Sequence, residues 1–85
     1  MAEIVIYTTV VCPYCVRAKR LLDFKGAAYR ELDVTSDEEL RRAMVQSSGR
    51  RTVPQIFIDG RPIGGYVELR ALEDAGELDA LLETR

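Results

Sequence analysis

The fold of this chain is indicated first by residues 4–15, IVIYTTVVCPYC. Residues 4–8 are apolar or β-branched without interruption, which is typical of a strand buried on both faces of a sheet. From Pro13 to Lys25 the apolar side chains instead share one helical face, and Gly26 is suited to end a helix. The two cysteines therefore mark the point at which a strand gives way to a helix.

The segments after this helix predict a second strand and a second helix. Residues 28–34 suit a partly exposed strand, and the strand–helix–strand order implies that the two strands pair in parallel. Residues 36–39, SDEE, have the form of a capping box with Ser36 as the cap. We therefore expect a helix that begins at Ser36 and ends at Gly49.

The last third of the chain predicts a hairpin followed by two helices. Asp59-Gly60 is a strong two-residue turn signal between residues 55–58 and 61–64, and Pro62 marks the outer strand as an edge. Leucines then recur at helical spacing on both sides of Gly76, which indicates a helix, a break and a short closing helix. The order βαβαββα(α) over residues 1–85 predicts a single α/β domain. Its mixed four-stranded sheet, flanked by helices, has the arrangement of thioredoxin-like proteins.

Composition and charge exclude several functional classes. Twelve basic and fourteen acidic residues leave a net charge of -2, so no overall field recruits nucleic acid or an anionic membrane surface. The first residues lack the basic region of a secretory signal, and no apolar run is long enough to span a membrane. We expect a cytoplasmic protein, and in that compartment structural disulfides are rare.

The two cysteines are the main candidates for chemistry. Pro13 suits the first position of a helix, because its missing N–H would be unsatisfied there. Cys12 then lies at or beside the N-cap, where free backbone N–H groups and the helix dipole stabilise a thiolate. Cys15 lies one turn into the helix and should be less exposed. The pair can close into a disulfide, and Cys12 is the member that can attack from solvent.

Other uses of these cysteines fit the sequence poorly. Tetrahedral zinc takes three or four protein ligands, and this chain has two cysteines and no histidine. A zinc site would therefore have to be shared between chains, and we predict no metal site. The absence of histidine also excludes catalysis by a Cys–His pair. A C-x-x-C motif within a βαβ pattern is a redox signature.

Three weaker signals are compatible with ligand binding, and each has a plainer alternative. Thr52-Val53-Pro54 could be the start of an edge strand, or a cis proline that turns the Val53 backbone toward the sulfurs. Gly64-Gly65, just before a helix, could be an ordinary turn or a place to hold a carboxylate. Arg41, Arg50 and Arg51 could be a solvated basic face or a local cluster that binds an anionic ligand. Tyr14 and Tyr66 could be half-buried packing residues or the walls of a groove.

Taken together, these motifs resemble the glutaredoxin family over essentially the whole chain. The markers are Cys12-Pro13-Tyr14-Cys15, Thr52-Val53-Pro54 and Gly64-Gly65, in this order and at these separations. Ser48-Gly49-Arg50 adds a likeness to the short bacterial members with two active-site cysteines. The resemblance implies a thioredoxin-like fold, a cis bond before Pro54 and glutathione as the electron donor. It implies no permanently bound cofactor.

The resemblance also implies a footprint for glutathione. The Val53 backbone would pair with the cysteinyl part, and the backbone of Val67 and Glu68 would receive the γ-glutamyl end. Arg41 and the Arg50–Arg51 pair would meet the glycyl carboxylate. The predicted glutathione-binding residues are Tyr14, Arg41, Arg51, Thr52, Val53, Pro54, Gly65, Tyr66, Val67 and Glu68. Two positions depart from the family: Thr9 stands where many members have a lysine, and Val67 where many have a hydroxyl or an acid.

The implied activity is thiol–disulfide exchange by a monomer. Cys12 alone would reduce glutathione mixed disulfides, and Cys12 with Cys15 would reduce protein disulfides. One alternative is an iron–sulfur carrier, in which Cys12 from two chains and two glutathiones hold a [2Fe–2S] cluster. Pro13 argues against that role, because relatives known for it mostly have glycine there. Another alternative is a dedicated reductant of one enzyme, recycled by a thioredoxin reductase.

Overall fold

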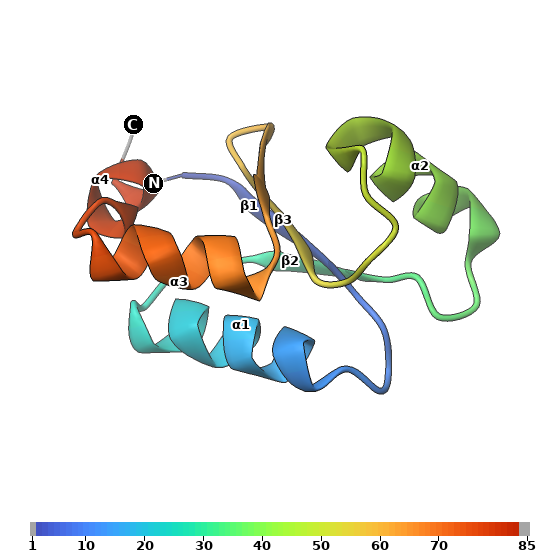
Figure 1. The fold of residues 1–85 in the computed structure, drawn as a ribbon, viewed down its shortest axis with the longest axis horizontal. Coiled ribbons are helices and arrows are strands. Elements are labelled where there is room, and N and C mark those ends of the chain that lie inside the picture. Colours follow the sequence, from blue (N-terminus) through green and yellow to red (C-terminus); the bar gives the residue numbers. More distant parts are fainter. Residues whose placement is uncertain (1, 84–85) are drawn as a thin grey trace.

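The computed structural model describes residues 2–83 as a four-stranded sheet with helices on both faces (Figure 1). The strands are β1 (Ile4–Thr8), β2 (Arg30–Asp33), β3 (Gln55–Ile58) and β4 (Arg61–Gly64). The helices are α1 (Pro13–Phe24), α2 (Glu38–Ser48), α3 (Tyr66–Asp74) and α4 (Leu78–Leu82). The strand order is β2-β1-β3-β4, with β1 and β2 parallel and the other two pairs antiparallel. The predicted thioredoxin-like order βαβαββα(α) is confirmed.

The core lies between one face of the sheet and three helices. Figure 1 shows α1 and α3 side by side, with α4 beyond the end of α3. The core consists of apolar side chains from β1, β3, α1, α3 and α4: Ile4, Ile6, Ala18, Leu21, Leu22, Ile56, Ile58, Leu69 and Leu78. Because α1 packs into this core, its first turn and the cysteines on it are held against the end of β1.

The first strand is less buried than its sequence predicts. Ile4, Ile6 and Thr8 are buried, but Val5 and Tyr7 are half-buried. On their face the sheet is covered by α2, and a cavity of about 310 Å³ remains there, lined in part by Val5 and Tyr7. The expectation that β1 is buried on both faces is therefore wrong, and the strand buried at every position is β3.

Two boundaries also differ from expectation. The cap of α2 is Asp37 and not Ser36, because the Asp37 carboxylate accepts a hydrogen bond of 3.0 Å from the Leu40 N–H. A carboxylate at this position also interacts favourably with the helix dipole. The second strand covers Arg30–Asp33 rather than residues 28–34. Its partner β1 ends at Thr8, opposite Asp33, so no paired strand continues beyond that point.

The local turn signals are confirmed. Asp59 and Gly60 both have positive φ, 52° and 81°, and join β3 to β4. The outer strand β4 is an edge of the sheet, as Pro62 indicated. Gly76, with φ of 75°, separates α3 from α4. Among residues 2–83 no helix has the length and apolar character needed to cross a membrane.

Candidate active site

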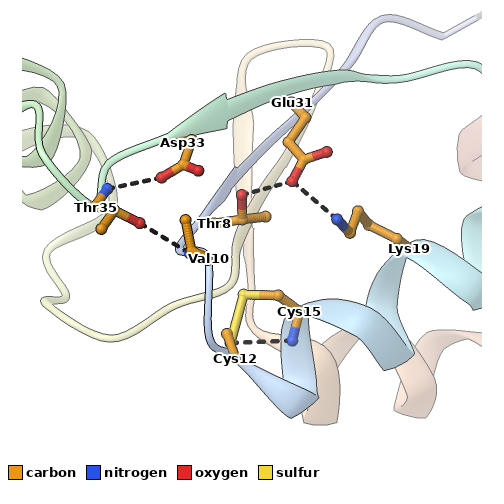
Figure 2. A network of polar contacts seen from close by, with 8 residues as sticks. All are labelled: Thr8, Val10, Cys12, Cys15, Lys19, Glu31, Asp33 and Thr35. Atoms are coloured by element: carbon orange, nitrogen blue, oxygen red, sulfur yellow. Dashed lines mark hydrogen bonds and ion pairs between the residues drawn. A yellow bond between two sulfur atoms is a disulfide. The ribbon is translucent and has the colours of Figure 1, made fainter.

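Cys12 caps the first helix and Cys15 lies one turn inside it. Cys12 has extended backbone angles (φ -158°, ψ 97°), and its Sγ accepts a hydrogen bond of 3.1 Å from the Cys15 N–H. Pro13 follows as the first helical residue, as predicted. The two sulfurs form a disulfide, with the Cα atoms 5.2 Å apart (Figure 2). Cys12 is half-buried, whereas Cys15 is only 1% exposed. The predicted asymmetry between the two cysteines is therefore present in the structure.

A charged network lies along the same helix face as Cys15. Lys19, four residues after Cys15, pairs with Glu31 of β2 at 2.9 Å. The Glu31 carboxylate also accepts a hydrogen bond of 2.7 Å from the hydroxyl of Thr8, which is fully buried (Figure 2). The Thr8 hydroxyl, and after it Lys19, lower the pKa of Glu31, while the hydrogen bond to Glu31 raises the pKa of Lys19. This network ties the middle of α1 to β2 and to the end of β1.

A second network holds the loop that leads to Cys12. The Val10 N–H donates to the Thr35 hydroxyl at 2.8 Å, and the Thr35 N–H donates to the Asp33 carboxylate at 2.8 Å (Figure 2). The Thr35 hydroxyl and N–H both lower the pKa of Asp33. Thr9, the first residue after β1, donates its hydroxyl to the Val11 carbonyl at 3.4 Å. The loop before the cysteines is therefore fixed by β2 and the segment after it.

The loop of residues 52–54 comes up against the sulfurs. The Val53–Pro54 bond is cis, and the Val53 carbonyl oxygen lies 3.7 Å from the Cys12 Sγ. Gln55, only 1% exposed, donates its side-chain amide to the Thr52 carbonyl at 2.8 Å and to the Thr52 hydroxyl at 3.2 Å. Sequence reasoning missed this role of Gln55. The available signal was an amide residue at the start of an otherwise apolar strand.

The glycine pair brings a third segment close to this loop. Gly64 has a φ of 117°, and a Cβ there would lie 2.9 Å from the Glu68 Cγ. A Cβ on Gly65 would lie 3.2 Å from the Pro54 carbonyl oxygen. Gly65 is the N-cap of α3, and its N–H donates to the Glu68 carboxylate at 2.8 Å. The missing Cβ of Gly64 thus leaves room for the Glu68 side chain, and that of Gly65 leaves room for the Pro54 carbonyl.

The Glu68 carboxylate is also bound by an arginine. Arg50 Nη2 donates to Glu68 Oε2 at 3.0 Å. This contact, and after it the hydrogen bond from Gly65, lower the pKa of Glu68, and the same ion pair raises the pKa of Arg50. Glu68 thus joins the start of α3 to the segment that follows α2.

These three segments enclose a groove of about 320 Å³ beside Cys12. Its walls include two tyrosines whose rings stack with centroids 6.1 Å apart and planes at 28°. The lining residues are Tyr14, Arg50, Thr52, Val53, Pro54, Gly65, Tyr66, Val67 and Glu68. The structure therefore brings together all the predicted glutathione-binding residues except Arg41 and Arg51.

The basic residue on the groove is Arg50. Arg41 is half-buried and donates from Nη2 to the Val34 carbonyl at 3.4 Å, and Arg51 is exposed. Neither lines the groove in the part of the chain that the structure describes. Their contact with glutathione stays a prediction, and Arg50 is the arginine that lines the groove.

Comparison with known proteins identifies the family to which the chain is similar. The Glutaredoxin family model matches residues 4–63. The chain is 51% identical to Glutaredoxin 3 of Escherichia coli (strain K12) over 98% of this chain and 100% of that protein. It is 50% identical to a glutaredoxin of Pseudomonas aeruginosa, over 96% of this chain and 98% of that protein.

Solved structures agree in sequence and in fold. The solution structure of glutaredoxin from Brucella melitensis has a TM-score of 0.88 and 52% identity, covering 99% of this chain and 91% of that chain. The buckwheat glutaredoxin–glutathione complex has a TM-score of 0.87 and 32% identity, covering 95% of this chain and 76% of that chain. With these likenesses over almost its whole length, and with a Cys-Pro-Tyr-Cys motif at the start of its first helix, the chain belongs to the glutaredoxin family.

Proposed function

We propose that this chain is a glutathione-dependent thiol–disulfide oxidoreductase in which Cys12 is the attacking group. One observation carries the proposal. The Cys12 Sγ accepts the Cys15 N–H at a helix start and lies 3.7 Å from the carbonyl of Val53, which lines the groove. A sulfur in this position can act as a stabilised thiolate next to a bound thiol or disulfide. The family assignment and the glutathione complex of the buckwheat relative support the same reading.

The proposed reduction of a glutathione mixed disulfide needs Cys12 alone. The Cys12 thiolate attacks the glutathione sulfur of R–S–S–G, and R–S⁻ leaves and takes up a proton. A glutathione thiolate then attacks the glutathione sulfur of the Cys12–S–S–G intermediate, which forms glutathione disulfide and returns Cys12 as a thiolate. The balance is R–S–S–G plus one glutathione giving R–SH plus glutathione disulfide.

The proposed reduction of a protein disulfide also uses Cys15. Cys12 forms a mixed disulfide with one substrate sulfur and releases the other as a thiol. Cys15, after losing its proton, attacks the Cys12 sulfur and releases the second substrate thiol, leaving the Cys12–Cys15 disulfide. The Cα separation of 5.2 Å is within the usual range for such a bond. Two glutathiones then restore both thiols and leave as glutathione disulfide.

Glutathione is proposed to lie in the groove with its thiol toward Cys12. Val53 would offer its backbone to the cysteinyl part, and the N–H groups at the start of α3, at Val67 and Glu68, would receive the γ-glutamyl carboxylate. The glycyl carboxylate would face Arg50, with Arg41 and Arg51 further out. Tyr14 and Tyr66 would form an aromatic wall.

The remaining features of the proposal concern the protein as a whole. Residues 1–85 act as one domain and one monomer, with glutathione as co-substrate and no permanently bound cofactor. The partners are glutathionylated or disulfide-bearing proteins of the cytoplasm, and nucleic acid and membranes are not among them. The net charge of -2 supports the exclusion of polyanions.

Reduction of a small glutathione mixed disulfide, coupled to NADPH through glutathione reductase, tests this function. Cys12→Ser should be inactive. Cys15→Ser should retain this activity and lose the reduction of protein disulfides. If Cys15→Ser were inactive and Cys12→Ser active in the first assay, the assigned roles would be reversed. An absorbance spectrum of the purified protein without visible cluster bands would set aside the iron–sulfur alternative.

A further inference from the structure

A second groove runs between α1 and α3 and has not been used by the proposed chemistry. Its volume is about 500 Å³. Figure 1 shows the two helices that form it lying side by side. The groove is lined by Arg17, Arg20, Leu21, Phe24, Tyr66, Arg70 and Glu73. It combines three arginines with apolar and aromatic side chains.

The charge of this groove is opposite in sign to that of the whole chain. Its carboxylate, Glu73, pairs with Lys25 at 2.9 Å, and Arg70 pairs with Asp74 at 3.1 Å. Within residues 2–83, neither Arg17 nor Arg20 has a carboxylate partner. The groove therefore presents two uncompensated positive charges on a protein of net charge -2.

An apolar side chain lies at the far end of the same groove. Phe24, the last residue of α1, is 81% exposed. A single exposed aromatic residue is common on protein surfaces. Here, however, it borders the same hollow as the arginines and Leu21. The groove thus offers charge along the middle of α1 and an apolar contact at its end.

The groove borders the candidate active site at one shared residue. Tyr66 lines both grooves. The Tyr14 ring stacks on Tyr66, and the Arg17 guanidinium lies 5.2 Å from the centre of the Tyr14 ring. A chain attacked by Cys12 can therefore pass over the two tyrosines into the second groove.

The spacing of the groove residues along α1 determines which residues of a substrate chain would contact the arginines and which would contact Phe24. Arg17, Arg20 and Phe24 follow Cys12 by five, eight and twelve residues, which is roughly 8, 12 and 18 Å along a helix. An extended chain advances about 3.3 Å per residue. Its side chains about two to four residues from the attacked cysteine would reach the arginines, and one about five residues away would reach Phe24.

From this geometry we propose that the groove between α1 and α3 docks an acidic segment of the protein whose disulfide is reduced. Carboxylates two to four residues from the attacked cysteine face Arg17 and Arg20, and an apolar residue beyond them packs on Phe24. The inference rests on the proposed reduction of protein disulfides. The shared border with the active-site groove at Tyr66 and the apolar end at Phe24 favour a peptide over a nucleic acid, which the net charge of the chain repels.

Two matched disulfide peptides test the inference. One carries glutamates at the second and fourth positions on each side of the reactive cysteine and a leucine beyond them, and the other carries glutamines in place of the glutamates. At low ionic strength the acidic peptide should have a kcat/KM roughly three- to tenfold higher, since two exposed charge contacts are involved. The preference should disappear at about 1 M salt, where the screening length is about 3 Å.

Three variants localise the effect. Arg20→Glu should abolish or invert the preference for the acidic peptide. Arg42→Glu, the same charge change on an exposed residue of α2, should leave the preference intact. Both should reduce a small glutathione mixed disulfide at the wild-type rate. Phe24→Ser should lower kcat/KM for the peptides with leucine and not for versions with serine at that position.

Each contrary outcome has a distinct meaning. Equal kcat/KM for the two peptides at low salt, or equal loss in Arg20→Glu and Arg42→Glu, would overturn the inference while the proposed function stands. Failure to reduce either peptide, with the small mixed disulfide still reduced, would remove protein-disulfide reduction and the inference with it. If the protein sediments as a dimer and Phe24→Ser dissociates that dimer, the groove is an interface with a second copy of the chain. Tighter binding of a short oligonucleotide than of the acidic peptide at Arg20 would assign it to nucleic acid.

Discussion

The carboxylate of Glu68 bridges two segments of the glutathione groove, because one oxygen accepts the Gly65 N–H at 2.8 Å and the other binds Arg50 at 3.0 Å. The Gly65 N–H and the Arg50 guanidinium are groups to which the carboxylate of a ligand could also bind. In the free protein, the Glu68 carboxylate therefore neutralises the positive charge of Arg50, which lines the groove.

The first prediction follows from this competition. Glu68→Gln removes the negative charge and keeps an oxygen that can accept the Gly65 N–H, so Arg50 becomes free for glutathione. The apparent KM for glutathione should fall by roughly two- to fivefold, the size expected for one exposed ion pair. Arg50→Gln should raise it by a similar factor. Glu39→Gln, on exposed α2, is the control. A higher KM in Glu68→Gln would mean that Glu68 attracts the ligand itself.

A second prediction concerns the stability of the fold at low pH. The pKa of Glu31 is lowered below its ordinary value of 4.5, first by the Thr8 hydroxyl and then by Lys19. A lowered folded-state pKa contributes stability that is complete above pH 4.5 and lost as the pH falls through the folded value. The free energy of unfolding of the wild type should therefore exceed that of Glu31→Gln near pH 6, and the difference should shrink steadily below pH 4.5. Urea unfolding at several pH values measures it. A difference independent of pH would mean that the charge of Glu31 does not stabilise the fold.

A third prediction compares two glycines with positive φ. Gly26 has open space where a Cβ would lie, whereas a Cβ on Gly64 would meet the Glu68 side chain at 2.9 Å. Gly26→Ala should cost about 1 kcal/mol for its backbone conformation alone. Gly64→Ala should cost about 1–3 kcal/mol and also lower the KM for glutathione, because the displaced Glu68 carboxylate would leave Arg50 free for the ligand. Chemical denaturation and the coupled assay measure the two effects. Equal behaviour of the two variants would show that the close approach at Gly64 is unimportant.

A fourth prediction concerns the reactivity of reduced Cys12. Its Sγ receives the Cys15 N–H at a helix start, which favours the thiolate. Alkylation of Cys12 in Cys15→Ser should therefore reach half its maximal rate at a pH below about 8.5, the value for a free thiol. The rate of iodoacetamide modification against pH gives the midpoint. A midpoint at or above the free-thiol value would contradict a stabilised thiolate.

The last prediction uses the departure at Thr9. Thr9 begins the loop after β1 and offers only a hydroxyl, which donates to the Val11 carbonyl. Thr9→Lys should lower both the alkylation midpoint of Cys12 and the KM for glutathione at low salt, because it adds a positive charge near both anions. The effect should fade as salt screens exposed charges beyond about 8–10 Å. An alkylation midpoint unchanged at low salt would show that position 9 does not face the sulfur.

The sequence determined those features that depend on a few neighbouring residues. Pro13 fits a helix start, Asp59-Gly60 can adopt the positive φ angles of a tight turn, and Gly76 interrupts a helix. Each of these follows from the backbone preference of the residues themselves. The strand-to-helix position of Cys12, and so the asymmetry of the two sulfurs, follows from the same local rules. Even at this level competing signals can mislead, since Asp37 and not Ser36 caps α2.

Only the tertiary structure decided which distant groups meet. That Arg50 lines the groove and Arg41 and Arg51 do not depends on where the segment after α2 lies against α3. The roles of Gln55 and Glu31 likewise depend on contacts with another segment or strand. A hydrogen bond or ion pair requires placement to within a few tenths of an ångström. Local preferences do not set such distances, which result from how the helices pack on the sheet.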